Sequence, residues 1–138
     1  TRFNITLEEG VDLVLWALEN TQGGEIFVPK IPSYHVTDLA EAIGPSCRQE
    51  IVGIRPGEKI HEEMITVSDS YFTVDLGKYF AVLRSPAESG AEYLIEKYSA
   101  KMVEPGFSYN SRDNEEFLSI DQIRALIRKH VDTHFQPV

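Results

Sequence analysis

The run from Gly53 to Lys59 constrains the fold more than any other part of the sequence. Pro56 removes a backbone donor and fixes its own φ, while the glycines on either side let the backbone bend tightly. The apolar residues before this run predict a strand over about 49–54, and the spacing after it predicts a helix over about 57–65. The sequence therefore predicts a stiff corner with Arg55 at the end of a strand.

A guanidinium held on such a corner suits bidentate recognition of a phosphate or a carboxylate. The same pattern also fits an ordinary loop arginine ahead of a helix. The residues by themselves leave both interpretations of Arg55 open.

The composition of the chain limits which ligands and macromolecules it could bind. The chain has 138 residues, which fit one domain over 1–138, and a formal net charge of −9. This acidic balance argues against a nucleic acid or an anionic membrane as partner, because neutralising phosphates needs a basic face. A small anionic ligand needs only a few local cations. No apolar run in the sequence is long enough to span a bilayer. The one cysteine, Cys47, fits a reducing compartment. We therefore expect a cytoplasmic protein.

Caps and periodicity divide the rest of the chain into short elements. Capping boxes that begin at Thr6 and Ser119 predict helices over about 7–20 and from 120 onward. We further expect a strand over 25–28, a short helix over 37–43, a hairpin of 71–74 with 79–83, an ambiguous stretch over 86–106 and a polar loop over 109–114. The predicted class is α/β in the mixed α+β sense, with few short strands and several helices.

Four runs of the sequence together resemble one family, namely residues 1–6, 23–30, 53–62 and 109–118. Their order and spacing resemble the C-terminal part of the inverting UDP-N-acetylglucosamine 4,6-dehydratases. These are extended short-chain dehydrogenases among the polysaccharide biosynthesis proteins, and they feed pathways such as that of pseudaminic acid. Each run alone is weak, but the combination is specific and covers the chain to about Leu126.

The resemblance implies a division of labour. In that family an N-terminal Rossmann domain binds NADP and holds the catalytic residues, while the C-terminal part closes over the UDP-sugar. This sequence has no Gly-x-Gly-x-x-Gly run, so we expect neither a Rossmann domain, nor catalytic residues, nor a cofactor in this chain. The expected partners are a UDP-sugar such as UDP-GlcNAc and a Rossmann domain on the same or another chain. Surfaces left open without that domain favour a homo-oligomer. The alternative is a free-standing binding or assembly module derived from the same domain.

The resemblance also implies site residues. Arg55 matches the arginine expected to grip the UDP diphosphate, and Glu58 could orient it or meet a ribose hydroxyl. Arg2 matches a position in the substrate-facing first segment, and Asn114 lies in a loop that looks like the substrate-contacting loop. Phe117 stands where the family more often has tryptophan.

Three other patterns have ordinary interpretations. Tyr93 and Lys97 have the spacing of the superfamily's catalytic pair but follow the substrate-domain motifs, so we interpret them as a packing residue and a solvated charge. His130 and His134 lie one helical turn apart without a third ligand, so we predict no metal site. Trp16 lies away from the apolar stripe of the first helix, where it either widens that stripe or contacts a partner domain.

Overall fold

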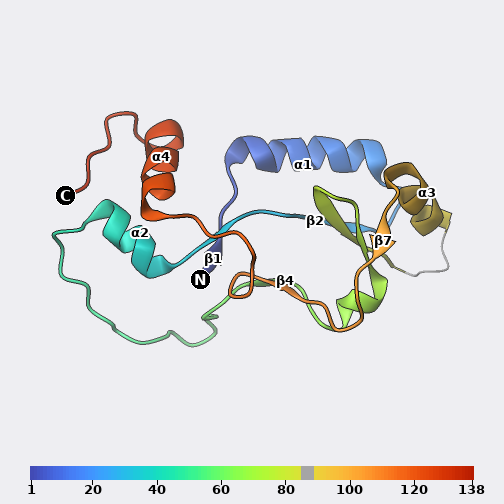
Figure 1. Cartoon of the computed structure of the whole chain (residues 1–138), viewed down its shortest axis with the longest axis horizontal. Coiled ribbons are helices and arrows are strands. Elements are labelled where there is room, and N and C mark those ends of the chain that lie inside the picture. The colour runs from blue at the N-terminus through green and yellow to red at the C-terminus, as the bar shows by residue number, and fades with distance from the viewer. Residues whose placement is uncertain (85–88) are drawn as a thin grey trace. The chain divides into compact units, whose positions relative to one another are not determined.

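The computed structural model describes residues 1–84 and 89–138 (Figure 1). The chain divides into two compact units that interleave along the sequence. Unit 1 comprises Thr1–Thr6, Ile31–Glu62 and Ser111–Val138, and unit 2 comprises Leu7–Lys30 and Glu63–Asn110. Both contain helices and short antiparallel strands, so the predicted mixed α/β class is confirmed. The single domain over 1–138 stays a prediction.

Unit 2 is built on a four-stranded antiparallel sheet with the strand order β2-β6-β5-β7. The predicted hairpin is confirmed, because Thr73–Asp75 (β5) pairs with Tyr79–Val82 (β6) and Gly77 turns the chain between them at φ +86°. The other edges of this hairpin pair with Ile26–Pro29 (β2) and Lys101–Met102 (β7). A short 3-10 helix, Asp69–Phe72 (η1), precedes β5 and takes up Tyr71 and Phe72, which the sequence assigned to the hairpin.

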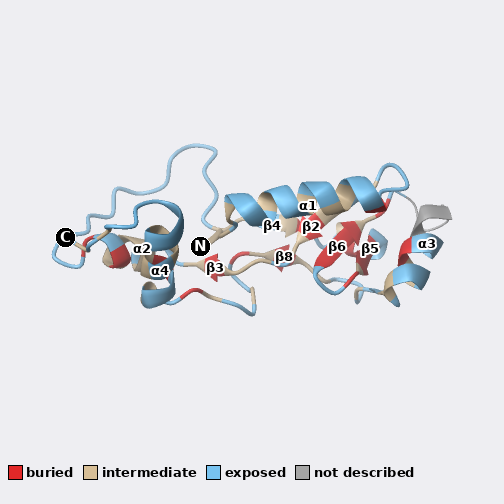
Figure 2. Ribbon diagram, turned by 90° about the horizontal axis from the view of Figure 1, so that it is seen from above, coloured by how far each residue is buried: buried red, intermediate tan, exposed pale blue. Residues whose placement is uncertain are grey.

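Helix α1, Leu7–Asn20, turns its tryptophan inward and its apolar stripe outward. The ring centroid of Trp16 lies 5.0 Å from that of Phe27, 4.5 Å from that of Tyr79 and 5.6 Å from that of Tyr98. Trp16 therefore packs within unit 2. The stripe is 49–85% exposed and consists of Leu7, Val11, Val14, Leu15 and Leu18. Figure 2 shows the corresponding exposed surface along α1.

Helix α3, Ser89–Tyr98, joins the C-terminal end of α1 through polar contacts. The Nζ of Lys97 donates to Asn20 Oδ1 (2.7 Å) and to Tyr93 Oη (2.9 Å), and Tyr98 Oη also donates to Asn20 Oδ1. The last turn of α1 has no basic residue, so Lys97 supplies the positive charge that stabilises a helix C-terminus. The hydrogen bond with Tyr93 raises the pKa of Lys97. Lys97 is exposed, as the interpretation of a solvated charge expects, and it forms these contacts in addition.

Unit 1 packs two helices against each other, Val36–Ile43 (α2) and Ile120–His130 (α4). The capping box of α4 is confirmed, because Ser119 Oγ accepts from Gln122 N–H while Gln122 Oε1 accepts from Ser119 N–H. Two short strands, Arg2–Phe3 (β1) and Ser33–Tyr34 (β3), pair antiparallel beside them. The buried core between the helices consists of Ala42, Leu118 and Ile123.

The strand predicted over 49–54 and the helix predicted over 57–65 are both wrong. Residues 49–62 contain neither a helix nor a strand, and Ile51 and Val52 are 98% and 87% exposed. Their β-branched side chains have no partner strand to pair with and no core to cover. The end of the predicted helix forms Glu63–Ile65 (β4), which pairs with Tyr109–Asn110 (β8) at the start of the predicted loop. Pairing with a distant segment therefore overrides the helical spacing.

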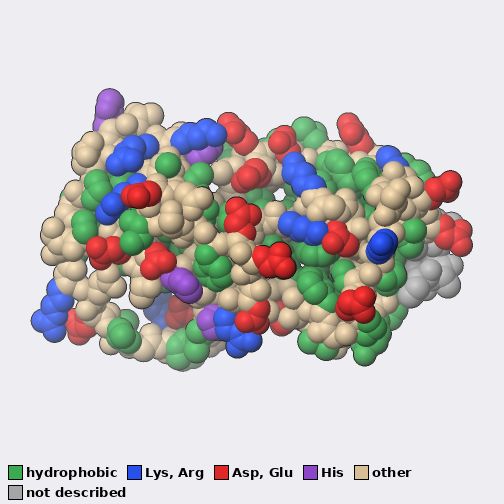
Figure 3. Space-filling view, viewed as in Figure 1, with side chains coloured by type: hydrophobic (Ala, Val, Ile, Leu, Met, Phe, Trp, Pro, Cys, Tyr) green, Lys and Arg blue, Asp and Glu red, His purple; other side chains and the backbone are tan. Residues whose placement is uncertain are grey.

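Surface properties add two observations. In the described parts of the chain, no helix has both the length and the apolar character needed to cross a membrane. Figure 3 shows Lys and Arg side chains scattered among acidic ones on the face that it draws.

Candidate functional site

The predicted corner exists as a tight turn without the flanking strand and helix. The N–H of Glu58 donates to Arg55 O (3.0 Å), with Pro56 and Gly57 between them and Gly57 at φ +80°. Proline at the second position and a positive-φ glycine at the third are typical of a type II turn. The Glu58 side chain closes the turn a second time, because its Oε2 accepts from Arg55 N–H at 3.1 Å.

Arg55 is exposed on this turn. Within the described residues its guanidinium makes no hydrogen bond and no ion pair. The backbone of Arg55 is thus fixed by two hydrogen bonds with Glu58, whereas its side-chain donors stay available. This is the arrangement required of a residue that recognises an anionic ligand.

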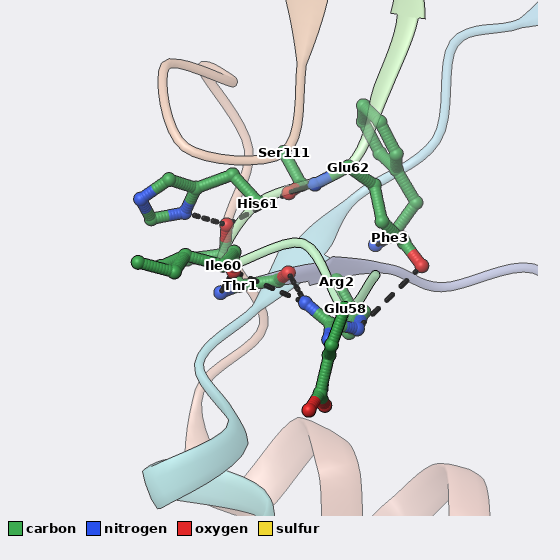
Figure 4. Close-up of polar contacts among 8 residues, drawn as sticks. All are labelled: Thr1, Arg2, Phe3, Glu58, Ile60, His61, Glu62 and Ser111. Carbon is green, nitrogen blue, oxygen red and sulfur yellow. Dashed lines mark hydrogen bonds and ion pairs between the residues drawn. The ribbon is translucent and has the colours of Figure 1, made fainter. Parts of the chain in front are cut away.

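Arg2 lies on β1 and holds the segment that follows the turn (Figure 4). Its Nη1 donates to Thr1 O (2.7 Å) and to Ile60 O (3.1 Å). Its guanidinium also forms ion pairs with Glu58 (Nη2 to Oε1, 3.7 Å) and Glu62 (Nε to Oε1, 3.6 Å). The structure therefore brings Arg2 and Glu58 together, and the guanidinium of Arg2 makes two hydrogen bonds and two ion pairs within the protein.

Asn114 contacts a different part of unit 1. Its Nδ2 donates to Ile31 O (2.8 Å) and to Ser33 Oγ (2.9 Å), which holds the loop before α4 against the start of β3. No hydrogen bond or ion pair among the described residues joins Asn114 to Arg2, Arg55 or Glu58. The Oδ1 of Asn114 makes no hydrogen bond among the described residues.

Sequence reasoning missed a polar cluster beside Arg2, which we call the hydroxyl cluster: Thr1, His61, Glu62 and Ser111. Ser111 is fully buried, and its Oγ accepts from Glu62 N–H (2.9 Å) and lies 2.7 Å from Thr1 Oγ1. Thr1 Oγ1 in turn lies 2.8 Å from His61 Nδ1. The Oε2 of Glu62 accepts from Phe3 N–H at 2.8 Å. The cluster joins three chain segments far apart in sequence, so no spacing could have indicated it.

Burial and nearby charges favour the neutral form of the histidine in this cluster. Desolvation lowers the pKa of His61, and the positive charges of Arg112 and Arg2 lower it further against the opposing charge of Asp113. A neutral imidazole has one donor and one acceptor nitrogen.

Two further kinds of site bear on the function, namely a metal site and a site for the dinucleotide that the resemblance implies. Across 1–84 and 89–138, no group of three or more His, Cys, Asp or Glu side chains could hold a metal ion. The ladders between described strands are antiparallel, whereas dinucleotide sites use parallel strands joined through a glycine-rich turn and a helix. These residues therefore do not fit NADP.

Comparisons with known proteins find relatives along most of this chain. The UDP-N-acetylglucosamine 4,6-dehydratase (inverting) of Campylobacter jejuni subsp. jejuni serotype O:23/36 (strain 81-176) is 41% identical over 133 residues, covering 92% of this chain and 39% of the relative. The UDP-glucose 4-epimerase of Rickettsia akari (strain Hartford) is 30% identical over 133 residues, covering 92% of this chain and 38% of the relative. The X-ray structure of Pen from Bacillus thuringiensis is similar with a TM-score of 0.73 at 29% identity, covering 92% of this chain and 38% of that one.

The chain thus spans about two fifths of the length of the curated relatives it matches. In the dehydratases the matching portion is the C-terminal part. The family described as "Polysaccharide biosynthesis protein" matches residues 1–84, which is more than half of the chain. The chain belongs to this polysaccharide biosynthesis protein family.

Proposed function

We propose that this chain is the UDP-sugar-binding portion of a UDP-N-acetylglucosamine 4,6-dehydratase that serves surface-polysaccharide synthesis in the cytoplasm. The whole enzyme oxidises the sugar at C4, eliminates water across C5 and C6, and returns the hydride to C6. The hydride chemistry would be supplied by NADP held on another part of the enzyme, because the described residues of this chain do not fit that cofactor. The residues of this chain bind and orient the nucleotide end, which positions the sugar for that chemistry.

The observation that carries the proposal is the guanidinium of Arg55, which has no partner among the described residues and lies on a turn closed by two hydrogen bonds. A donor group on a rigid backbone loses less conformational freedom when it binds a diphosphate. In this proposal Glu58 orients the turn, Arg2 holds the segment behind it, and Asn114 offers its Oδ1 to the ligand. The carboxylate of Glu58 also limits where a diphosphate can approach, because like charges repel.

The proposed protein partner is a Rossmann domain on the same or another chain. Support comes from the exposed stripe of α1, where five large apolar residues from Leu7 to Leu18 face away from unit 2. Exposed apolar surface of this kind is typical of a contact surface. Where that domain is absent, the same stripe favours a homo-oligomer. This stripe also supports the second candidate, a free-standing binding or assembly module without catalysis.

Calorimetric titration with UDP-GlcNAc tests the binding role. We expect Arg55→Ala to weaken binding about 10- to 100-fold, as for a lost charge-assisted contact, and Arg55→Lys to retain part of the affinity. Lys59→Ala is the matched control, because Lys59 is another exposed cation on the same segment. Equal affinity of the wild type and Arg55→Ala would overturn the role of Arg55. Absence of binding by the wild type would favour the assembly module.

Incubation with UDP-GlcNAc and NADP tests the division of labour. We expect no 4-keto-6-deoxy product from this chain alone, because its described residues do not fit the dinucleotide. Measurable product would contradict the proposal that catalysis belongs to another part of the enzyme.

A further inference from the structure

A short hydrogen-bonded chain connects buried Ser111 to His61 (Figure 4). The Oγ of Ser111 lies 2.7 Å from Thr1 Oγ1, and Thr1 Oγ1 lies 2.8 Å from His61 Nδ1. The same Ser111 Oγ accepts from Glu62 N–H at 2.9 Å. Because each hydroxyl has a single proton, the direction of donation along this chain can be derived.

Ser111 sets the direction because it is fully buried and its own proton needs an acceptor. Thr1 Oγ1 is the acceptor within reach of it, since the Glu62 backbone amide is itself a donor. Once Thr1 accepts from Ser111, its own proton goes to His61 Nδ1. An accepting Nδ1 means that the neutral ring carries its proton on Nε2.

Protonation of His61 would disrupt this chain. A proton on Nδ1 would point at Thr1 Oγ1, whose own proton would then have no acceptor among these groups. The charged groups around the ring act in the same direction on balance, since Arg112 and Arg2 together disfavour protonation more than Asp113 favours it. His61 is therefore held as a neutral ring in one tautomer.

The donor nitrogen of this ring faces away from the hydroxyl cluster. Figure 4 shows the far edge of the His61 ring pointing outward, and the side chain is only half-buried. No hydrogen bond to Nε2 occurs among the described residues. His61 also belongs to the segment that carries Arg55, six residues further along the chain.

We infer that the Nε2–H of His61 donates to an oxygen of the UDP half of the nucleotide sugar, an inference that rests on the proposed function. The charge of Arg55 attracts the diphosphate from any direction, whereas a neutral donor fixed by Thr1 and Ser111 recognises one oxygen at one position. Thr1 and Ser111 act through His61 and are positioning residues.

Nuclear magnetic resonance of the imidazole nitrogens tests the tautomer without any ligand. We expect the Nε2–H tautomer of His61 in the wild type between pH 6 and pH 8. Thr1→Val keeps the shape of the side chain and removes the middle hydroxyl, so the tautomer preference should weaken and the pKa of His61 should move toward its ordinary value. A dominant Nδ1–H tautomer in the wild type would overturn the inference whatever the ligand data show.

Titration with UDP and with UDP-GlcNAc tests the contact. His61→Gln places an N–H near the position of Nε2 and should bind within about threefold of the wild type, while His61→Asn and His61→Ala should bind about tenfold more weakly. His134→Ala, at an exposed histidine, should bind like the wild type. Unchanged binding by His61→Ala would overturn the inference and leave the proposed function intact. A loss seen with UDP-GlcNAc and not with UDP would also overturn it, and failure of the wild type to bind either ligand would overturn both.

Discussion

Two leucines in unit 2 should respond very differently to the same substitution. Leu94 on α3 is 0% exposed and packs in the core with Val74 and Leu83, whereas Leu18 on α1 is 70% exposed. Truncating a buried leucine removes its transfer free energy and leaves a cavity, so Leu94→Ala should lower the free energy of unfolding by about 3 kcal/mol.

The expected effect of Leu18→Ala follows from its exposure. Only about a third of its surface leaves water on folding, and full burial of a leucine is worth roughly 2 kcal/mol, so the lost burial amounts to about 0.6 kcal/mol. The slightly higher helix propensity of alanine offsets part of this loss. The free energy of unfolding should therefore fall by about 0.5 kcal/mol or less.

Urea unfolding followed through the fluorescence of Trp16 measures both variants, because Trp16 is the single tryptophan and packs against the same core. With a slope of about 2 kcal/mol per molar urea, the midpoint should fall by roughly 1.5 M for Leu94→Ala and by less than about 0.3 M for Leu18→Ala. The slope itself should not change.

Comparable losses in the two variants would refute the outward orientation of the stripe on α1. Repeating the measurement at tenfold lower protein concentration separates two causes, since a stripe covered by a second copy gives a concentration-dependent midpoint. A loss below about 1 kcal/mol for Leu94→Ala would instead refute its place in the core.

Three other properties of the chain can be tested by single substitutions. Gly57→Ala should lower the free energy of unfolding by about 1–2 kcal/mol, because Gly57 has φ +80°. Gly10→Ala in α1 should raise the free energy of unfolding by about 0.5–1 kcal/mol, since alanine favours a helix and the added Cβ meets nothing within 4 Å. Urea midpoints measure both changes. Lys97→Met should speed amide hydrogen exchange in the last turn of α1, and unchanged exchange would contradict its role there. Hydrogen bonds from Thr66 lower the pKa of Asp69, so its stabilisation is present above the ordinary value of 3.8 and is lost as the pH falls through the lower folded-state value. The difference in urea midpoint between the wild type and Asp69→Asn should therefore be constant near neutral pH and shrink at acidic pH, and a constant difference throughout would contradict this cause.

Elements that carry their own signals could be predicted from the sequence. Helix α4 has a capping box at Ser119, and the β5–β6 hairpin has Gly77 at its turn, so both form where local chemistry indicates. The Pro56–Gly57 turn is equally local and was found for the same reason. The predicted helix after it was wrong because Glu63–Ile65 pairs with β8, which comes much later in the chain, and the predicted strand before it was wrong because Ile51 and Val52 have no partner strand.

The orientation of α1 and the hydroxyl cluster could not be predicted for a related reason. The aliphatic stripe of α1 is the more apolar face by spacing, yet Trp16 buries its large ring against three aromatic neighbours on the opposite face. His61 and Ser111 come together only after separate segments of unit 1 have folded. In both cases the deciding contacts are between residues whose spacing in the sequence carries no information.

The interleaving of the two units also affects the order in which they can form during synthesis. Unit 2 is complete once residue 110 has been made, whereas unit 1 waits for Ser111–Val138. Until α4 emerges from the ribosome, Ala42 of α2 cannot pack against Ile123, its neighbour in the core of unit 1. The sheet of unit 2 can therefore form before unit 1 is complete. A chain that stops at residue 110 would keep the core of unit 2 and would expose the residues of the unit 1 core to proteases and chaperones.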